Sequence, residues 1–190
     1  MGETSMATVV HQRMSVEQFE REYMGKRAEL WRGEVREYMP AGPKQGEVAL
    51  NIGAEVRDFV RHNKIGKAYA AETGFVIHTS EGDSVLAPDV AFIRQERLPE
   101  GGFPKGFSRV VPDLVVEVMS PDDTYSQVRE KVREWLAGGV QVVWVVDPER
   151  RVVEVWQSQE EPAQVLSEDD TLRGEPVLPG FELPVRVIFE

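Results

Sequence analysis

The sequence predicts an α/β protein in which a mixed β-sheet is flanked by helices. Two apolar runs, Leu114–Met119 and Val140–Val146, have the composition of strands that are covered on both faces. Residues 124–138 between them have helical spacing, and a strand, a helix and a strand in so short a stretch form a unit with parallel pairing. A further amphipathic segment, residues 44–64, supplies a second helix.

The N-terminal part of the chain predicts a short helix followed by a hairpin. Ser15-Val16-Glu17-Gln18 has the pattern of a capping box, which opens a helix through about Tyr23. Residues 29–39 alternate around Arg32-Gly33, as a small β-hairpin does. Pro40-Ala41-Gly42-Pro43 then breaks the chain before the long helix.

From residue 44 the predicted order of elements is α-β-β-β-α-β. Residues 67–78 and 84–93 are interpreted as two strands joined near Glu81-Gly82-Asp83, and Leu114–Met119 is the third. The remaining predicted elements are a loop at 95–111, a strand at 152–156 and a last strand near 183–189. We expect a single domain, residues 1–190, with a core of about 44–147, an N-terminal helix and hairpin, and extra C-terminal strands.

Composition excludes several classes of protein. The chain has no cysteine, so disulfides and thiolate metal sites are excluded. No stretch approaches the roughly 20 apolar residues of a membrane span, and the first residues lack the plan of a signal peptide. We therefore expect a cytoplasmic protein with no membrane partner. The net charge of −11 argues against a protein that coats nucleic acid generally, although a local basic surface remains possible.

Two acidic residues interrupt apolar strands. Asp89 follows Pro88 within the second predicted core strand, and Glu117 lies within the third. Charged groups are seldom buried without a partner or a metal ion, and two acids that meet would repel one another unless a cation joined them. We expect their carboxylates within about 6 Å of each other, the reach of one shared cation. The alternative is that Asp89 ends a strand or caps a turn and that Glu117 lies on a solvent face.

Lys131 lies on the predicted helix 124–138 at the border of its apolar stripe, beside Val128 and Trp135. Its stem could run along apolar surface and deliver the ammonium group to the end of a strand. The alternative is an ordinary lysine in the charge run Arg129-Glu130-Lys131.

The combination resembles a known family. Pro88-Asp89, Glu117 in Val-Val-Glu-Val-Met-Ser-Pro, Lys131 and Val-Asp-Pro at 146–148 are similar to the Uma2-like endonuclease group of the PD-(D/E)XK, or restriction-endonuclease-like, superfamily. The resemblance spans about residues 29–157, and the superfamily's core has the order α-β-β-β-α-β. The superfamily's usual lysine lies two residues after the second acid, where this chain has Met119. Uma2-like sequences carry it on the following helix instead, at the place of Lys131.

The resemblance implies a metal-dependent phosphodiesterase acting on DNA. Asp89 and Glu117 would hold Mg²⁺ or Mn²⁺ with a backbone carbonyl near Val118, and Lys131 would orient the attacking water or stabilise charge on the phosphate.

Two features of the resemblance remain open. A further acid from the first core helix would be Glu47 or Glu55, and Gln45 stands where Uma2-like proteins often have a histidine. Two other functions also remain open. One is a nuclease-fold protein that binds nucleic acid without cutting it. The other is a structural module whose acidic residues are surface charge.

We predict that the protein forms a homodimer or a larger assembly. Many nuclease-fold proteins cut duplexes in pairs, and the C-terminal strand region offers an edge for a partner copy to cover. Light scattering at high protein concentration should give at least twice the 21.5 kDa chain mass. A mass of one chain would contradict the prediction.

Overall fold

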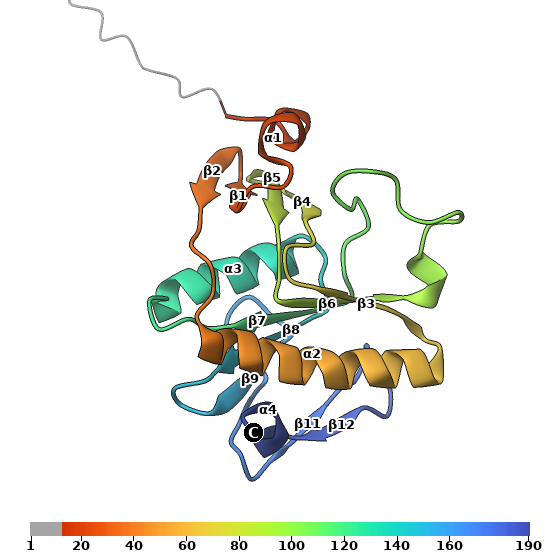
Figure 1. Ribbon diagram of the computed structural model, residues 1–190, viewed down its shortest axis with the longest axis vertical. Coiled ribbons are helices and arrows are strands. Elements are labelled where there is room, and N and C mark those ends of the chain that lie inside the picture. The colour runs from red at the N-terminus through yellow and green to blue at the C-terminus, as the bar shows by residue number, and fades with distance from the viewer. Residues whose placement is uncertain (1–12) are drawn as a thin grey trace, which may run out of the picture.

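The computed structural model describes residues 13–190, and the expectation of no signal peptide concerns residues that lie mostly outside this range. The strands form a central six-stranded sheet, a four-stranded sheet and a two-stranded ribbon (Figure 1). In chain order the elements are α1 (Val16–Tyr23), β1 (Ala28–Trp31), β2 (Glu34–Glu37), α2 (Pro43–Asn63), β3 (Gly66–Ala70), β4 (Phe75–Thr79), β5 (Gly82–Leu86), β6 (Val90–Arg94), a 3₁₀ turn η1 (Gln95–Arg97), β7 (Leu114–Val118), α3 (Tyr125–Ala137), β8 (Val142–Asp147), β9 (Val152–Trp156), β10 (Gln164–Leu166), β11 (Thr171–Arg173), β12 (Glu182–Pro184) and α4 (Val185–Ile188).

The central sheet has the mixed pairing that the sequence predicts. Its strand order is β10-β9-β8-β7-β6-β3, in which only β7 and β8 are parallel. Helix α3 connects these two strands, as a parallel pair requires. Within this sheet the chain runs α2, β3, β6, β7, α3, β8, so the predicted α-β-β-β-α-β order is confirmed.

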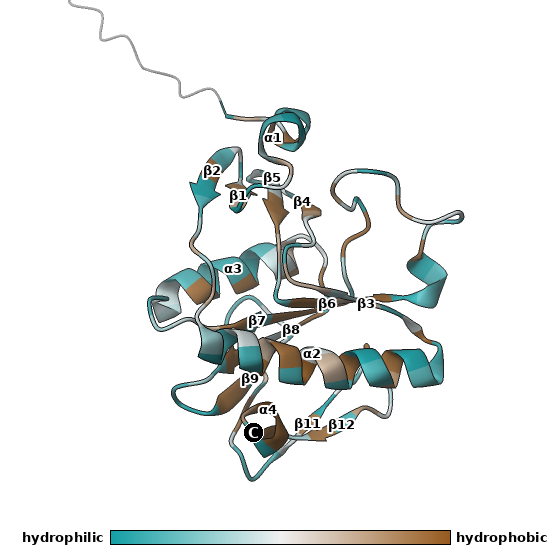
Figure 2. Cartoon of the chain, in the orientation of Figure 1, coloured by the Kyte–Doolittle hydropathy of each residue, from teal (hydrophilic) through white to brown (hydrophobic). Residues whose placement is uncertain are grey.

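Helices cover both faces of the central sheet, and the apolar strands lie between them (Figures 1 and 2). Helix α2 buries Val48, Ile52, Val56 and Val60 against one face, together with the C-terminal segment that contains α4. Helix α3 buries Val132 and Trp135 against the other face, together with side chains of the four-stranded sheet. This double coverage explains why β7 is buried at every position.

The prediction of two continuous strands, 67–78 and 84–93, was wrong, because part of each segment belongs to a second sheet. This four-stranded sheet has the order β2-β1-β5-β4. Each of those segments breaks in the middle, at residues 71–74 and 87–89. Their outer halves, β3 and β6, pair in the central sheet, whereas β4 and β5 form a hairpin that packs on β1. The turn near Glu81 is where the sequence places it.

Most other boundaries of the helices and strands lie where the sequence predicts them. Ser15 and Thr124 each form a complete capping box, and α3 ends at Gly138. The loop at 95–111 contains only the turn η1 and one isolated bridge. The last strand was predicted wrongly, because β12 ends at Pro184 and the next residues form α4, whose Val185 and Ile188 are buried at helical spacing. Among the helices of residues 13–190, none is long and apolar enough to cross a membrane.

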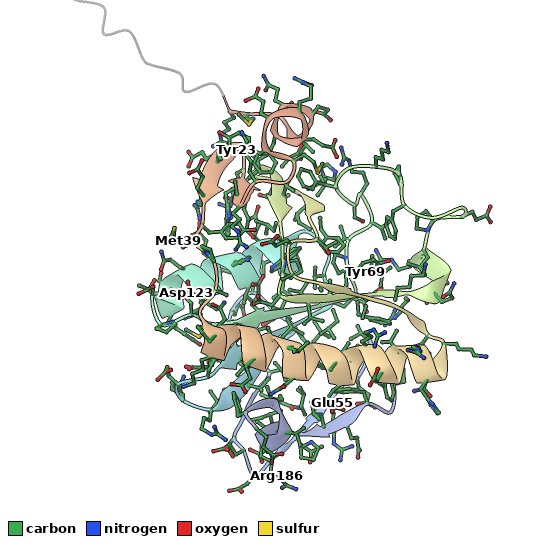
Figure 3. The ribbon with its side chains drawn as sticks, viewed as in Figure 1. Tyr23, Met39, Glu55, Tyr69, Asp123 and Arg186 are labelled. Carbon is green, nitrogen blue, oxygen red and sulfur yellow. The ribbon has the colours of Figure 1, made fainter. Side chains whose placement is uncertain are left out.

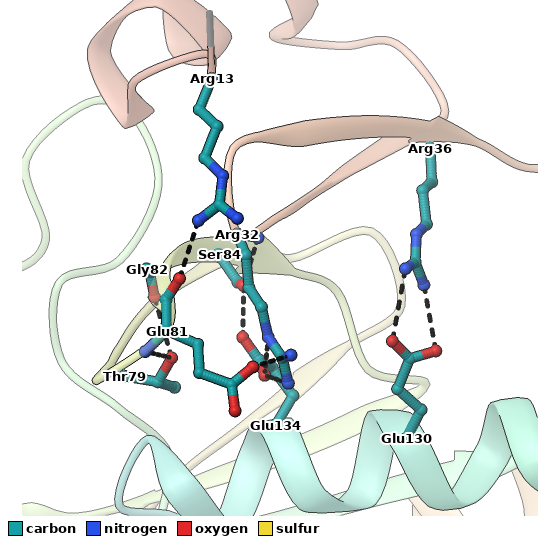
Figure 4. Close-up of polar contacts among 9 residues, drawn as sticks. All are labelled: Arg13, Arg32, Arg36, Thr79, Glu81, Gly82, Ser84, Glu130 and Glu134. Atoms are coloured by element: carbon teal, nitrogen blue, oxygen red, sulfur yellow. Dashed lines mark hydrogen bonds and ion pairs between the residues drawn. The ribbon is translucent and has the colours of Figure 1, made fainter. Parts of the chain in front are cut away.

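A partly buried ion pair joins the N-terminal hairpin to α3 (Figure 4). Glu134 is fully buried, and its carboxylate accepts hydrogen bonds from Arg32 Nε at 3.0 Å, Arg32 Nη2 at 2.7 Å and Ser84 Oγ at 2.5 Å. Arg32 lies in the turn of the hairpin with a positive φ of 49°, and it also pairs with Glu81. The pair therefore joins the hairpin, β5 and α3.

We predict that Glu134→Gln lowers the free energy of unfolding by about 2–3 kcal/mol, because Arg32 loses its buried counter-charge. Glu130→Gln is the matched control, one turn earlier on α3, since the Glu130 side chain is 42% exposed and pairs with Arg36 only at 3.4 Å. This control should change stability by less than about 0.5 kcal/mol. Urea denaturation measures both variants, and equal effects would contradict a special role for Glu134.

Candidate functional site

Glu117 is the centre of the site. It lies on β7 with its side chain directed towards α3, and it is 9% exposed. Its Oε1 accepts a hydrogen bond from Trp135 Nε1 at 2.7 Å, and its Oε2 lies 3.1 Å from Lys131 Nζ. The predicted alternative, a Glu117 on a solvent face, is therefore not what the structure shows.

Lys131 is held by three acceptors. Its Nζ lies 3.0 Å from Glu29 Oε1 and 3.1 Å from Glu117 Oε2, and it donates to the carbonyl of Ala87 at 3.2 Å. An ammonium group has three N–H donors, so each has a partner here. The predicted course of this side chain, from the border of the α3 stripe to the strand ends, agrees with these contacts.

Asp89 occupies the bend just before β6 and not the strand itself. The register Val90↔Val116 of β6 and β7, continued by one residue, sets Asp89 opposite Glu117, on the face that also carries Ala91 and Val115. Asp89 Oδ2 accepts a hydrogen bond from the backbone N–H of Val118 at 2.7 Å. Because this N–H bonds a side chain, the backbone ladder between β6 and β7 ends at the site.

The carbonyl of Val118, the predicted backbone ligand, also borders the site. It accepts a hydrogen bond from Gln45 Nε2 of α2 at 2.8 Å. A carbonyl oxygen has two lone pairs, so one remains available for another partner.

Burial shapes the electrostatics of these groups. It raises the pKa of Glu117 to about 8, with repulsion from Asp89 and Glu29 adding to the effect and Lys131 opposing it. Burial also raises the pKa of Asp89, against the hydrogen bond from Val118 and the charge of Lys131. Burial alone would lower the pKa of Lys131, but the carboxylates of Glu117 and Glu29 outweigh it and raise that pKa. Lys131 is therefore a cation close to two acids, Glu117 and Asp89, whose pKa values burial raises.

Comparison with known proteins gives the family. Residues 15–186 match Uma2, described as "Putative restriction endonuclease". The chain belongs to the Uma2 family. The fold is similar to the crystal structure of a putative nuclease belonging to DUF820 from Anabaena variabilis ATCC 29413, with a TM-score of 0.79 and 22% identity over 93% of this chain and 97% of that one. Among the curated proteins compared, none matches.

In this Uma2 protein the acids of α2 stay apart from the site contacts. Glu47 and Glu55 are both exposed, and within residues 13–190 no hydrogen bond or ion pair joins either of them to Asp89, Glu117 or Lys131. In Figure 3, Glu55 lies at the lower side of α2, whereas Asp123 is labelled at the left of the molecule. Asp123, close to Asp89, helps to raise its pKa.

Glu29 is a site residue that the sequence analysis missed. It lies on β1, and its carboxylate contacts Lys131 although the two residues are about a hundred positions apart. The alternating sequence pattern of residues 29–39 gives no local sign that Glu29 is buried, although Glu29, Leu30 and Trp31 are all buried in β1. The signal that could have revealed Glu29 is Lys131 at the border of the apolar stripe of α3. A largely buried ammonium group needs more than one acceptor, so a second acid was to be expected near Glu117.

The oxygen donors fit a hard divalent cation. Within the described range there is no cluster of three or more His, Cys, Asp or Glu side chains arranged to hold a metal ion. Mg²⁺, however, is usually bound by one or two carboxylates and keeps several waters. Asp89, Glu117 and the Val118 carbonyl match that pattern. With Glu29 and Lys131 the group carries a net charge of −2 when all are ionised, which a divalent cation would neutralise.

We predict that Glu117→Gln changes how stability depends on pH. The pKa of Glu117 is about 8 in the native protein and near 4.5 when unfolded, so wild-type protein should lose stability as pH rises through this window, whereas the variant should not. Because one pKa unit corresponds to about 1.4 kcal/mol, the variant should gain more than about 2 kcal/mol relative to wild type between pH 5 and 8.

Urea denaturation at several pH values, in EDTA, measures this difference. The exposed Glu47→Gln serves as the control and should run parallel to wild type. Parallel curves for Glu117→Gln would show that the buried carboxylate does not titrate as described.

Proposed function

We propose that this protein is a divalent-metal-dependent endonuclease that hydrolyses phosphodiester bonds in DNA with Mg²⁺ or Mn²⁺. The observations that carry the proposal are the facing positions of Asp89 and Glu117 at one end of the β6–β7 pair and the contact of Lys131 with Glu117 at 3.1 Å. Membership of the Uma2 family supports a nuclease, and the paired acids with a neighbouring lysine support metal-assisted hydrolysis.

Each group has a distinct task in this proposal. Asp89, Glu117 and the Val118 carbonyl would hold the metal. When bound, the metal would polarise a phosphoryl oxygen and lower the pKa of the attacking water. Lys131 carries a fixed positive charge beside the acids, where it would orient the water or stabilise charge that develops on the phosphate.

Two largely exposed cations near the site would be available to a DNA backbone, although the net charge of the chain is −11. A depression of about 240 Å³ lies beside the Val118 carbonyl, and its charged lining consists of the cations Lys44 and Arg150 and the acids Asp123, Asp147 and Glu149. Lys44 and Arg150 are both more than half exposed. In the proposal, DNA phosphates would contact Lys44 and Arg150 in competition with these acids, one of which, Glu149, lies 2.8 Å from Lys44, and binding should weaken as salt rises.

We predict that Asp89→Asn and Glu117→Gln each abolish metal-dependent cleavage and leave the fold intact. Both changes preserve shape and remove only a negative charge. Nicking of supercoiled plasmid DNA with Mg²⁺, Mn²⁺ or EDTA measures the activity, and thermal melting verifies folding. Glu55→Gln, an exposed acid of α2, is the control and should cleave like wild type.

We further predict that Lys131→Ala slows cleavage by about 10²–10³-fold without loss of metal binding, since one electrostatic contact to the reacting groups is typically worth that much. Single-turnover rates at saturating metal measure the effect. Wild-type protein that cleaves no nucleic acid with any metal would instead favour a binding protein, which Met119 in the usual lysine position would then explain. Cleavage that survives Asp89→Asn would refute the assigned site.

A further inference from the structure

Glu29 brings a third carboxylate to the site from the hairpin, outside the central sheet. Its side chain is 11% exposed, and both oxygens have partners. Oε1 accepts from the backbone N–H of Ala87 at 2.9 Å and lies 3.0 Å from Lys131 Nζ, while Oε2 accepts from Trp31 Nε1 at 3.0 Å. An acid held at both oxygens has a fixed position. We propose that Glu29 is the positioning residue for Lys131.

The three acceptors of Lys131 come from different parts of the fold. Glu117 belongs to β7, whereas Glu29 and the Ala87 carbonyl belong to β1 and to the segment that leaves β5. A hydrogen bond from Ala87 N to Glu29 joins the latter two. Two of the three acceptors, Glu29 and the Ala87 carbonyl, are thus linked to each other on the side of the four-stranded sheet. Together they determine where the ammonium group of Lys131 lies.

Glu29 also keeps Lys131 from pairing with Glu117 alone. A lysine side chain is a flexible four-carbon stem with a point charge at its end, so it moves to the nearest uncompensated acid. With Glu29 present, the ammonium group is shared between two carboxylates at nearly equal distances, 3.0 and 3.1 Å. Without Glu29, Lys131 would neutralise Glu117, the acid that the proposed function assigns to the metal.

The hairpin is fixed close to this contact. Glu134, which holds Arg32 in the hairpin turn, follows Lys131 by one turn of α3. Trp31, the donor to Glu29, lies between these two attachments and stacks with the guanidinium group of Arg36 at 4.3 Å from its ring centre. The Arg32–Glu134 pair therefore attaches the hairpin to α3 one helical turn after the Glu29–Lys131 pair.

The first test measures positioning without reference to activity. Brief acetylation with acetic anhydride, followed by peptide mass spectrometry, reports how accessible each lysine amine is. Glu29→Gln should raise labelling of Lys131 about tenfold, the change expected for losing one charged partner worth about 1.4 kcal/mol. Labelling of the exposed Lys44 should not change.

The matched control is Glu34→Gln, an exposed acid on the partner strand of the same hairpin, which should leave Lys131 protected. If Glu29→Gln does not fold, Glu29→Asp keeps the charge but withdraws it by one methylene, and it should also raise labelling of Lys131. Unchanged labelling of Lys131 in a folded Glu29 variant would overturn the proposal.

The second test rests on the proposed function and uses a double-mutant cycle. Glu29→Gln should slow cleavage about tenfold in wild-type protein and by less than about twofold in the Lys131→Ala background, because a residue that acts through Lys131 has nothing left to position. A merely structural role would give the same factor in both backgrounds, and that result would overturn the proposal. If wild-type protein does not cleave, the proposed function fails, but acetylation still decides the role of Glu29.

Discussion

A carboxylate in the middle of a buried strand is the constraint on which this structure depends. Glu117 replaces an apolar side chain in β7, and an isolated charge there would cost several kcal/mol. Both of its oxygens therefore face donors, Trp135 Nε1 and Lys131 Nζ, which lie one turn apart on α3. The apolar stripe of α3 packs on the sheet in the register that brings these two donors over Glu117.

The same requirement explains why the hairpin and the central sheet meet where they do. Lys131 needs more acceptors than β7 supplies, and Glu29 and the Ala87 carbonyl provide them. The ion pair of Arg32 and Glu134 attaches the hairpin close by. Glu117 and Glu29, which would repel one another without a cation, are thus ordered around Lys131 at one end of the β6–β7 pair. Asp89 and the Val118 carbonyl lie beside them.

Much of this arrangement could be predicted from the sequence, because its signals are local. The capping boxes at Ser15 and Thr124, the apolar face of α2 and the unbroken run in β7 each report their own surroundings. Acids within apolar strands, and a lysine at the border of an apolar stripe, were sufficient to single out Asp89, Glu117 and Lys131. They did not single out Glu29. What remained hidden depends on distant pairing.

The errors share that cause. The segments 67–78 and 84–93 alternate smoothly in sequence, yet each leaves one sheet for another, and only the β4–β5 pairing with β1 decides where they break. Residues 185–188 are apolar enough for a strand, but they pack as one helical turn beside α2. Glu29 lies in a segment whose sequence predicts an alternating strand, and its burial follows only from the contact between β1 and α3.

The central claim is that Asp89 and Glu117 form a cation site beside a lysine that stays in place. Crystals of the full chain grown with Mn²⁺ test it most directly, because the anomalous scattering of manganese locates the ion without reference to activity. The account predicts one strong anomalous peak between the carboxylates of Asp89 and Glu117, next to the Val118 carbonyl, and no such peak in Asp89→Asn crystals. Manganese bound elsewhere, or no peak between these carboxylates at a saturating concentration, would contradict it.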